Sequence, residues 1–193
     1  MGMKRILVMM AAVMLMGCEE GYISPLERGE RLKAKAEGGD ARSQSSLGFN
    51  YRIGWVEEGF EQDYVEAVKW YRKAAMQGDA SGQHGLGEMY SRGKGGLQQN
   101  FRRAFEWYLL SANQGYSLSQ WELSTIYEFG IGDKELDFVT SYAWLKLANI
   151  NEASSSLKPD MTRIKSKMTS TQITKAEELV KEMVKKNPKL LNK

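Results

Sequence analysis

Three tryptophans recur at a fixed interval of 37 residues, and this period constrains the fold more than any other feature of the chain. Trp70, Trp107 and Trp144 stand in similar segments, which read EAVKWYRKAA, RAFEWYLLSA and TSYAWLKLAN. Two further residue types repeat upstream in the same register, namely Leu47, Leu86 and Leu123, and Tyr51, Tyr90 and Tyr127. Self-similarity at a period of about 20 to 50 residues is typical of stacked repeats. We therefore expect an array of repeats rather than one closed core.

Each repeat is expected to contain two helices. The first helix starts near Ala41, Ala80 and Ser117. The second starts at an Asp or Asn whose side-chain oxygen can accept an unpaired backbone N–H, and these caps are Asp63, Asn100 and Asp137. Glu66 follows Asp63 at the spacing of a capping box. Glycine suits the left-handed conformation that ends a helix, which places helix ends at Gly39, Gly78 and Gly115. The third repeat runs on to Glu152.

The second helices carry apolar residues at helical spacing, as Val68, Trp70, Tyr71, Ala74 and Ala75 do in repeat one. One helix pair of this kind cannot bury its apolar face alone, but stacked pairs can. The sequence therefore predicts an all-α solenoid of three helix-turn-helix units, at about 40–78, 79–115 and 116–152.

Helices at both ends are expected to cap the solenoid. A helix over 25–39 begins with Ser24 as N-cap and Pro25 at its first position, where proline costs no hydrogen bond. The C-terminal segment, 153–193, is expected to hold a helix from about Asp160 to Met168, whose start Pro159 leaves open. A last helix runs from Thr169 to about Lys186, with one apolar stripe and a polar outer face.

The first seventeen residues have the pattern of a signal peptide. Lys4 and Arg5 precede an apolar run, Ile6 to Met16, of 11 residues, whereas a membrane-spanning helix needs about 20. Translation from Met3 would leave this pattern intact. The run ends in Leu-Met-Gly-Cys, which resembles a bacterial lipobox; that resemblance implies cleavage before Cys18 and acylation of this residue, the palmitate-bearing form of a lipoprotein.

Cys18 is the single cysteine of the chain and falls where the cut is expected, which favours lipidation over an ordinary secretory signal. Glu19, rather than an aspartate, follows it, and by resemblance this favours the outer membrane, with the domain facing the periplasm. The tether 18–24 spans at most about 25 Å, so the folded domain is expected to lie close to the membrane.

The repeats themselves resemble Sel-one-like repeats, which are relatives of the tetratricopeptide repeats. The family pairs Leu-Gly-x-x-Tyr in the first helix with Ala-x-x-Trp-Tyr-x-x-Ala-Ala in the second. Repeat one matches throughout, repeat two nearly so, and repeat three departs at Ser124 and Leu145, which replace a glycine and a tyrosine. The resemblance covers about residues 25–186 and implies a right-handed superhelix that binds other proteins on its concave side.

By the family's register, the concave side is formed by first-helix positions that do not pack on the second helix. The predicted partner-binding residues are Phe49, Arg52, His84, Glu88, Arg92, Trp121, Thr125 and Glu128. Trp121 is the favoured anchor, because tryptophan is enriched at binding hot spots and its aligned positions hold Ser45 and His84, which are not typical core residues. The alternative is that Phe49, Trp121 and Phe129 pack against the next unit or against the C-terminal cap; for Phe129 the two interpretations stay equally open.

Composition argues against several other classes. The net charge is +3, and removal of 1–17 leaves 25 basic and 24 acidic side chains, which offers no electrostatic footprint for nucleic acid. One cysteine allows no internal disulfide. His84 and Glu88 are four residues apart but have no second histidine or thiol for a metal, and the glycine-rich loop 92–96 lacks the strand that precedes a phosphate loop.

We therefore expect no cofactor, no metal, no small-molecule substrate and no enzymatic activity. Three hypotheses remain. The first is a membrane-anchored scaffold or adaptor in the bacterial envelope, the second a surface-displayed binder of a host or competitor protein, and the third an enzyme that acts on cell-wall glycans. The third would need a deep polar cleft with two inward carboxylates, which no motif indicates.

Overall fold

The computed structural model describes residues 23–152 and 156–191, and these residues form helices with no strand. The α-helices are α2 (Pro25–Glu37), α3 (Ala41–Ile53), α4 (Tyr64–Met76), α5 (Ala80–Arg92), α6 (Phe101–Ala112), α7 (Ser117–Phe129), α8 (Phe138–Glu152), α9 (Lys158–Lys165) and α10 (Ser170–Lys186). Two 3-10 helices, η1 (Val56–Glu58) and η2 (Pro188–Leu190), complete the fold. The predicted signal peptide and Cys18 lie outside the described residues.

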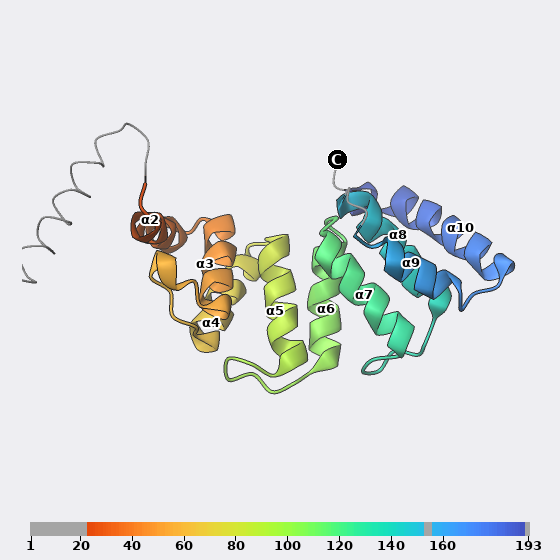
Figure 1. Cartoon of the computed structure of the whole chain (residues 1–193), viewed down its shortest axis with the longest axis horizontal. Coiled ribbons are helices and arrows are strands. Elements are labelled where there is room, and N and C mark those ends of the chain that lie inside the picture. Colours follow the sequence, from red (N-terminus) through yellow and green to blue (C-terminus); the bar gives the residue numbers. More distant parts are fainter. Residues whose placement is uncertain (1–22, 153–155, 192–193) are drawn as a thin grey trace, which may run out of the picture.

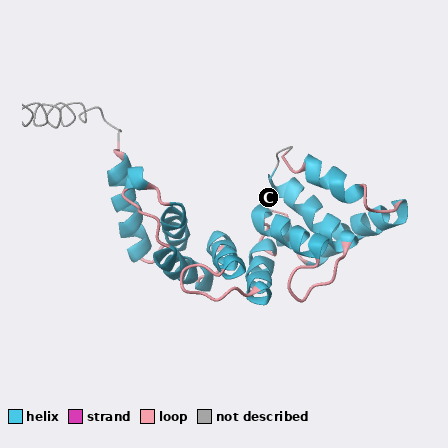
Figure 2. Ribbon diagram, turned by 60° about the horizontal axis from the view of Figure 1, so that its bottom comes forward, coloured by secondary structure: helices cyan, strands magenta, loops and turns pink. Residues whose placement is uncertain are grey.

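The helices form a curved row of hairpins. Repeats one to three are the pairs α3–α4, α5–α6 and α7–α8, which follow one another along the long axis of the molecule (Figure 1). The row bends into an arc (Figure 2). The first helices α3 and α5 pack together more closely than the second helices α4 and α6, so we take the side of the first helices as the inside of the bend. The predicted all-α array of three helix pairs with helices at both ends is confirmed.

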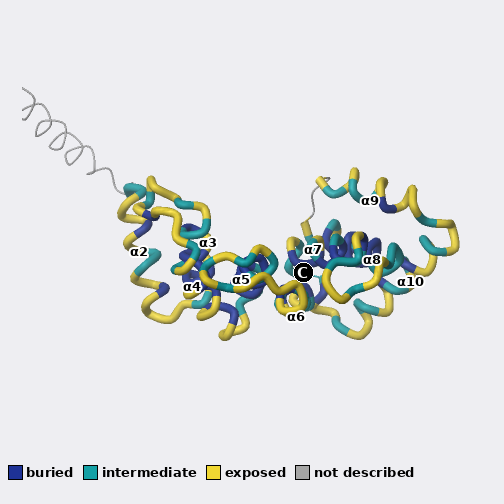
Figure 3. The backbone as a smooth tube through the Cα atoms, turned by 90° about the horizontal axis from the view of Figure 1, so that it is seen from below, coloured by how far each residue is buried: buried dark blue, intermediate teal, exposed yellow. Residues whose placement is uncertain are grey.

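The core is a series of clusters, each shared by adjacent units. Ala36 of α2 packs with Leu47 and Trp70 of repeat one. A second cluster joins Tyr71 of repeat one to Leu86 of repeat two, and others continue into α8 and α10. Buried residues follow the faces where helices meet, while the loops are exposed (Figure 3). No unit could bury its apolar face without a neighbour, as expected for a solenoid.

The predicted helix starts are confirmed, with caps on most of them. The side chain of Asp63 accepts the backbone N–H of Val65 at 2.8 Å, and Asn100 and Asp137 cap their helices in the same way. Glu66 does not complete a capping box at Asp63. Its carboxylate instead accepts hydrogen bonds from Lys69 and from the indole N–H of Trp70, because this indole is buried and needs an acceptor.

Repeat one contains a loop that the sequence did not reveal as part of the core. Its two extra residues lie between α3 and α4, where η1 packs against α2. Phe60, next to η1, is fully buried and meets the Tyr51 ring edge-on with centroids 5.2 Å apart. Gly29 of α2 allows η1 to pack this closely, since a Cβ at Gly29 would lie 2.0 Å from the carbonyl oxygen of Glu58 in η1.

The C-terminal helices close the last repeat. α10 packs on α8 and begins with the capping box of Thr169 and Gln172, as predicted. α9 begins at Lys158, two residues before the predicted start, because Pro159 occupies its second position, where the missing N–H needs no partner. Downstream, the side chain of Gln120 donates to the carbonyl of Leu190 at 3.0 Å, which ties η2 to repeat three. Within the part of the chain that the structure describes, no helix has the length and hydropathy to cross a membrane.

A tyrosine ring between glycines sets the distance between repeats one and two. Tyr71 of α4 lies against Gly48 of its own repeat and Gly85 of the next. A Cβ at Gly85 would lie 2.4 Å from this ring, and one at Gly48 would lie 2.8 Å from it. Because neither glycine has a side chain, α3 and α5 both approach the ring closely.

We predict that Gly85→Ala lowers the free energy of unfolding by about 1–3 kcal/mol, because the new methyl group must displace the buried Tyr71 ring. Thermal unfolding of the purified protein measures this. Ser46→Ala is the matched control, since Ser46 holds the same position in repeat one and is exposed. Alanine favours a helix by about 1 kcal/mol over glycine, so a Gly85→Ala protein that is more stable than the wild type by about this amount would contradict the proposed packing.

Candidate partner-binding face

We define the inner face as the surface of α3, α5 and α7 on the inside of the bend. All eight predicted partner-binding residues lie on these three helices. Phe49, Arg92 and Trp121 are exposed there, with relative exposures of 41% for Phe49 and 36% for Trp121. Arg52, His84 and Thr125 are half-buried, and Glu88 and Glu128 are buried. On the inner face the aromatic residues Phe49 and Trp121 are thus accessible to solvent, whereas the glutamates Glu88 and Glu128 are buried.

The two readings for Phe129 are resolved by its position. Phe129 is 59% exposed, so it is not buried against a neighbouring unit, and its contact with the C-terminal segment is the Lys167 ammonium 5.8 Å from its ring centroid. The expectation that Ser45 lies outside the core is wrong: Ser45 is 2% exposed and donates its hydroxyl to the carbonyl of Arg42. A small side chain with a local backbone acceptor fits between helices where a larger polar group would not.

Glu88 is held by arginines on both sides. Its carboxylate lies 3.4 Å from the guanidinium of Arg52, on α3, and 3.2 Å from that of Arg92, one turn further along α5. Arg52 also donates to the hydroxyl of Tyr71 at 3.3 Å. Two of the predicted partner-binding residues, Arg52 and Glu88, therefore bridge the inner helices of repeats one and two. This leaves Arg92 as the exposed member of the group.

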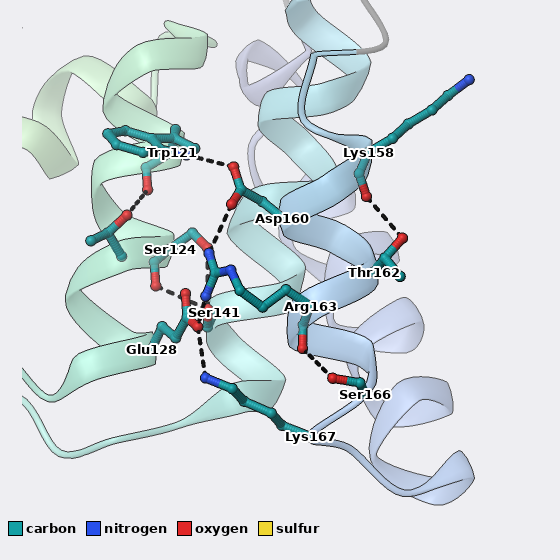
Figure 4. Close-up of polar contacts among 11 residues, drawn as sticks. Trp121, Ser124, Glu128, Ser141, Lys158, Asp160, Thr162, Arg163, Ser166 and Lys167 are labelled. Atoms are coloured by element: carbon teal, nitrogen blue, oxygen red, sulfur yellow. Dashed lines mark hydrogen bonds and ion pairs between the residues drawn. The ribbon is translucent and has the colours of Figure 1, made fainter.

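Glu128 lies beneath α9. Its carboxylate, 2% exposed, pairs with Arg163 of α9 and with Lys167 just beyond it, the latter at 3.1 Å (Figure 4). α9 also reaches Trp121, whose indole N–H donates to Asp160 at 3.4 Å. Glu128, a predicted partner-binding residue, is therefore covered in this structure, because α9 folds back onto α7. Trp121 keeps its indole N–H bound while more than a third of its side chain stays open to solvent.

His84 takes part in a directed chain of hydrogen bonds. The hydroxyl of Ser111 donates to the carbonyl of Ala80, and that of Ser119 donates to Ser111 at 2.8 Å. Nδ1 of His84 lies 3.1 Å from Ser119, whose proton is already used, so Nδ1 carries the proton and donates. Burial, followed by the charge of Arg52, lowers the pKa of His84 to about 4, which keeps the ring neutral at pH 7.

No metal site accompanies this histidine. Among residues 23–152 and 156–191, no group of three or more His, Cys, Asp or Glu side chains lies close enough to hold an ion. The His84 ring instead packs between Tyr108 and Tyr116, with centroids 5.5 and 5.3 Å away. His84 is therefore a neutral, half-buried polar side chain of the inner face.

Glu122 is the residue of this face that the sequence did not single out. It occupies on α7 the position that Gly85 holds on α5, and it faces Tyr108, the counterpart of Tyr71. Burial, and secondly the carboxylate of Glu88, raise the pKa of Glu122 to about 7, while Arg92 opposes the shift. The carboxylate of Glu122 makes no hydrogen bond or ion pair with another described residue. The available signal was the alignment, which places a glutamate where repeats one and two have Ser46 and Gly85.

We predict that Glu122→Gln stabilises the fold at pH 8 and has no effect near pH 4.5. The pKa of Glu122 is higher in the folded chain than in the unfolded one, so the stability that its neutral form contributes is lost as the pH rises through about 7. Glutamine cannot ionise. The gain at pH 8 should be about 2 kcal/mol after allowance for the water that still reaches the side chain.

Unfolding in urea at both pH values measures this difference. Glu106→Gln is the control, because Glu106 is an exposed glutamate on the neighbouring helix α6. A gain for Glu122→Gln that is the same at pH 4.5 and pH 8 would show that ionisation is not its source.

Comparison with known proteins identifies the repeats. The family model described as Sel1 repeat matches residues 41–79, 80–116 and 117–149, which are the three helix pairs with their loops. Proteins of this family are in general protein–protein interaction modules and are typically not enzymes. In sequence, no functionally curated protein matches the chain.

Two solved structures are similar. The crystal structure of c5321, described as a protective antigen present in uropathogenic Escherichia coli strains and displaying an SLR fold, aligns at 32% identity and a TM-score of 0.72. The match covers 85% of this chain and 34% of c5321, so the chain spans about a third of that protein. A Sel1 repeat protein from Oxalobacter formigenes aligns at 33% identity and a TM-score of 0.57, over 69% of this chain and 96% of that one.

The matched segments coincide with the hairpins that the packing defines, and the similar structures share their arrangement. The chain belongs to the Sel1 repeat family and has its fold, a right-handed α-solenoid.

Proposed function

We propose that this protein is a membrane-anchored scaffold or adaptor of the bacterial envelope that binds another protein on its inner face. The observation that supports this most directly is the exposure of large apolar side chains there. Phe49, Leu118, Trp121 and Phe129 are each at least about a third exposed, although each lies on a helix that contributes other residues to the core. Exposed aromatic residues beside arginines are typical of protein-binding hot spots.

The anchor in this proposal is Cys18, acylated after cleavage of residues 1–17. Its support is the charged start, the short apolar run and the single cysteine at the expected cut. More than one acyl chain holds a protein firmly, so the domain would stay at the membrane. Because the tether is short, the partner is expected to be another envelope protein near the same membrane surface. The favoured location is the outer membrane, with the domain facing the periplasm.

A surface-displayed binder is the second candidate, and one finding favours it. The similar protein c5321 is described as a protective antigen present in uropathogenic Escherichia coli strains. Protease added to intact cells separates the candidates, since a chain facing the periplasm stays whole until the outer membrane is opened. Digestion of the chain on intact cells would favour the surface-displayed binder over the scaffold that faces the periplasm.

We predict that a photoreactive residue in place of Trp121 captures one envelope protein in living cells, because this position is exposed at the centre of the proposed contact. Mass spectrometry identifies the captured protein. The matched control is a photoreactive residue in place of Met76, which is 78% exposed on α4, a second helix on the outside of the bend.

The same experiment in a Cys18→Ser background tests the anchor. We expect the protein to leave the membrane fraction and the capture at position 121 to fall severalfold. Equal capture at positions 121 and 76 would contradict the inner-face assignment, and membrane association that survives Cys18→Ser would contradict the lipid anchor.

A further inference from the structure

We propose that the inner face between α5 and α7 receives a basic side chain, an arginine or a lysine, of the partner protein, with the carboxylate of Glu122 as its acceptor. This inference rests on the proposed function, since it specifies the chemistry by which the inner face recognises a protein.

The neighbouring inner helices on either side are joined by ion pairs. From α3, Arg52 reaches Glu88 of α5. From the far side of α7, Arg163 of α9 reaches Glu128. Between α5 and α7, which both lie wholly within the described residues, the structure has no ion pair, and the only hydrogen bond between their side chains joins His84 to Ser119. At the α3–α5 junction and at the α7–α9 junction, an arginine of one helix therefore forms an ion pair with an inner-face glutamate of the other.

Glu122 takes the place of a glycine at this junction. In repeat two the corresponding residue is Gly85, which lets α5 close onto the Tyr71 ring and pack along α3. Glu122 instead has a side chain whose charge acts on Tyr108, and α5 and α7 do not pack together as α3 and α5 do. A glutamate therefore lies at a junction where the two inner helices are less closely packed.

The charges around Glu122 leave it without a cation. Arg92 is the basic residue that acts on it from α5, but Arg92 pairs with Glu88 at 3.2 Å. Burial and the Glu88 carboxylate both disfavour the ionised form of Glu122 and raise its pKa. A cation placed beside the carboxylate would favour the ionised form and lower this pKa again, which supports the inference. A guanidinium placed here would form a charge-assisted hydrogen bond in partly desolvated surroundings, where such bonds are strong.

Residues beside Glu122 fit the stem of a long basic side chain. Leu118 lies one turn before Glu122 on the same side of α7 and is exposed, and Trp121 is exposed on the adjoining side of the helix, toward α9. Lysine and arginine place their methylene groups on apolar surface while the charged end reaches a polar partner. The segment recognised is therefore expected to carry apolar residues next to its arginine or lysine.

The test selects binders without knowledge of the partner. Random peptides of about twelve residues are displayed and selected on the full, acylated protein in detergent, and the best is synthesised with a fluorescent label. We expect a shared arginine or lysine, whose replacement by citrulline or glutamine weakens binding about tenfold. Glu122→Gln should weaken binding equally, with no further loss when both changes are combined, and Glu106→Gln should leave the affinity within about twofold.

The pH dependence separates a direct ion pair from a structural effect. The groups that face Glu122 are Glu88 and Arg92 from α5 and Tyr108 from α6, and neighbouring His84 stays neutral above about pH 5. Affinity for the wild type should fall about tenfold or more from pH 8 to pH 5.5, as Glu122 takes up a proton, and should not fall for Glu122→Gln. Because this variant is expected to be the more stable protein, weaker binding would not come from unfolding.

Two results would overturn the inference: selected peptides that lack a basic residue, or affinities that Glu122→Gln leaves unchanged. Failure to select any peptide counts against it as well. Displacement of the peptide by spermine at micromolar concentration would also count against it, by assigning the acidic position to a free polyamine. If position 121 still captures its envelope protein when Glu122 is glutamine, the proposed function stands and this inference alone fails.

Discussion

The packing of a tyrosine ring against backbone determines how closely the inner helices of neighbouring repeats can approach. Tyr71 lies against Gly48 and Gly85, and the absence of side chains at both positions brings α3 and α5 together. Tyr108 has Gly87 in its own repeat but Glu122 in the next. The closely packed junction and the less closely packed one therefore differ at this register position. We infer that this difference contributes to the spacing of the inner helices.

Local features of the fold were predictable from the sequence because they depend on nearby residues. Helix starts follow from capping side chains such as Asp63 and Asn100, and the repeat boundaries follow from the 37-residue period. The burial of Glu128 was not predictable in this way, since it depends on α9, more than thirty residues away, folding back with Arg163. Phe60 was missed for a similar reason, because its loop is an insertion that the repeat pattern does not describe.

The candidate site was predictable in position more than in chemistry. The family register placed all eight selected residues on the inner helices, yet Arg52, Glu88 and Glu128 have partners within the chain. Ion pairs between helices cannot be recognised from one sequence, because their members belong to different repeats. Glu122 has the opposite property: its departure from Gly85 was visible in the alignment, but its significance depends on the Tyr108 ring and on Glu88 beside it.

The central claim is that Glu122 holds α5 and α7 apart and so keeps the inner face open. A distance measurement between spin labels tests it directly, with labels at Arg92 and Phe129, the exposed last residues of the two helices. The account predicts that Glu122→Gly, which restores the residue found in repeat two, shortens this distance by several ångströms because α7 can close onto Tyr108. An unchanged distance would contradict the account and would mean that another contact sets the spacing of these repeats.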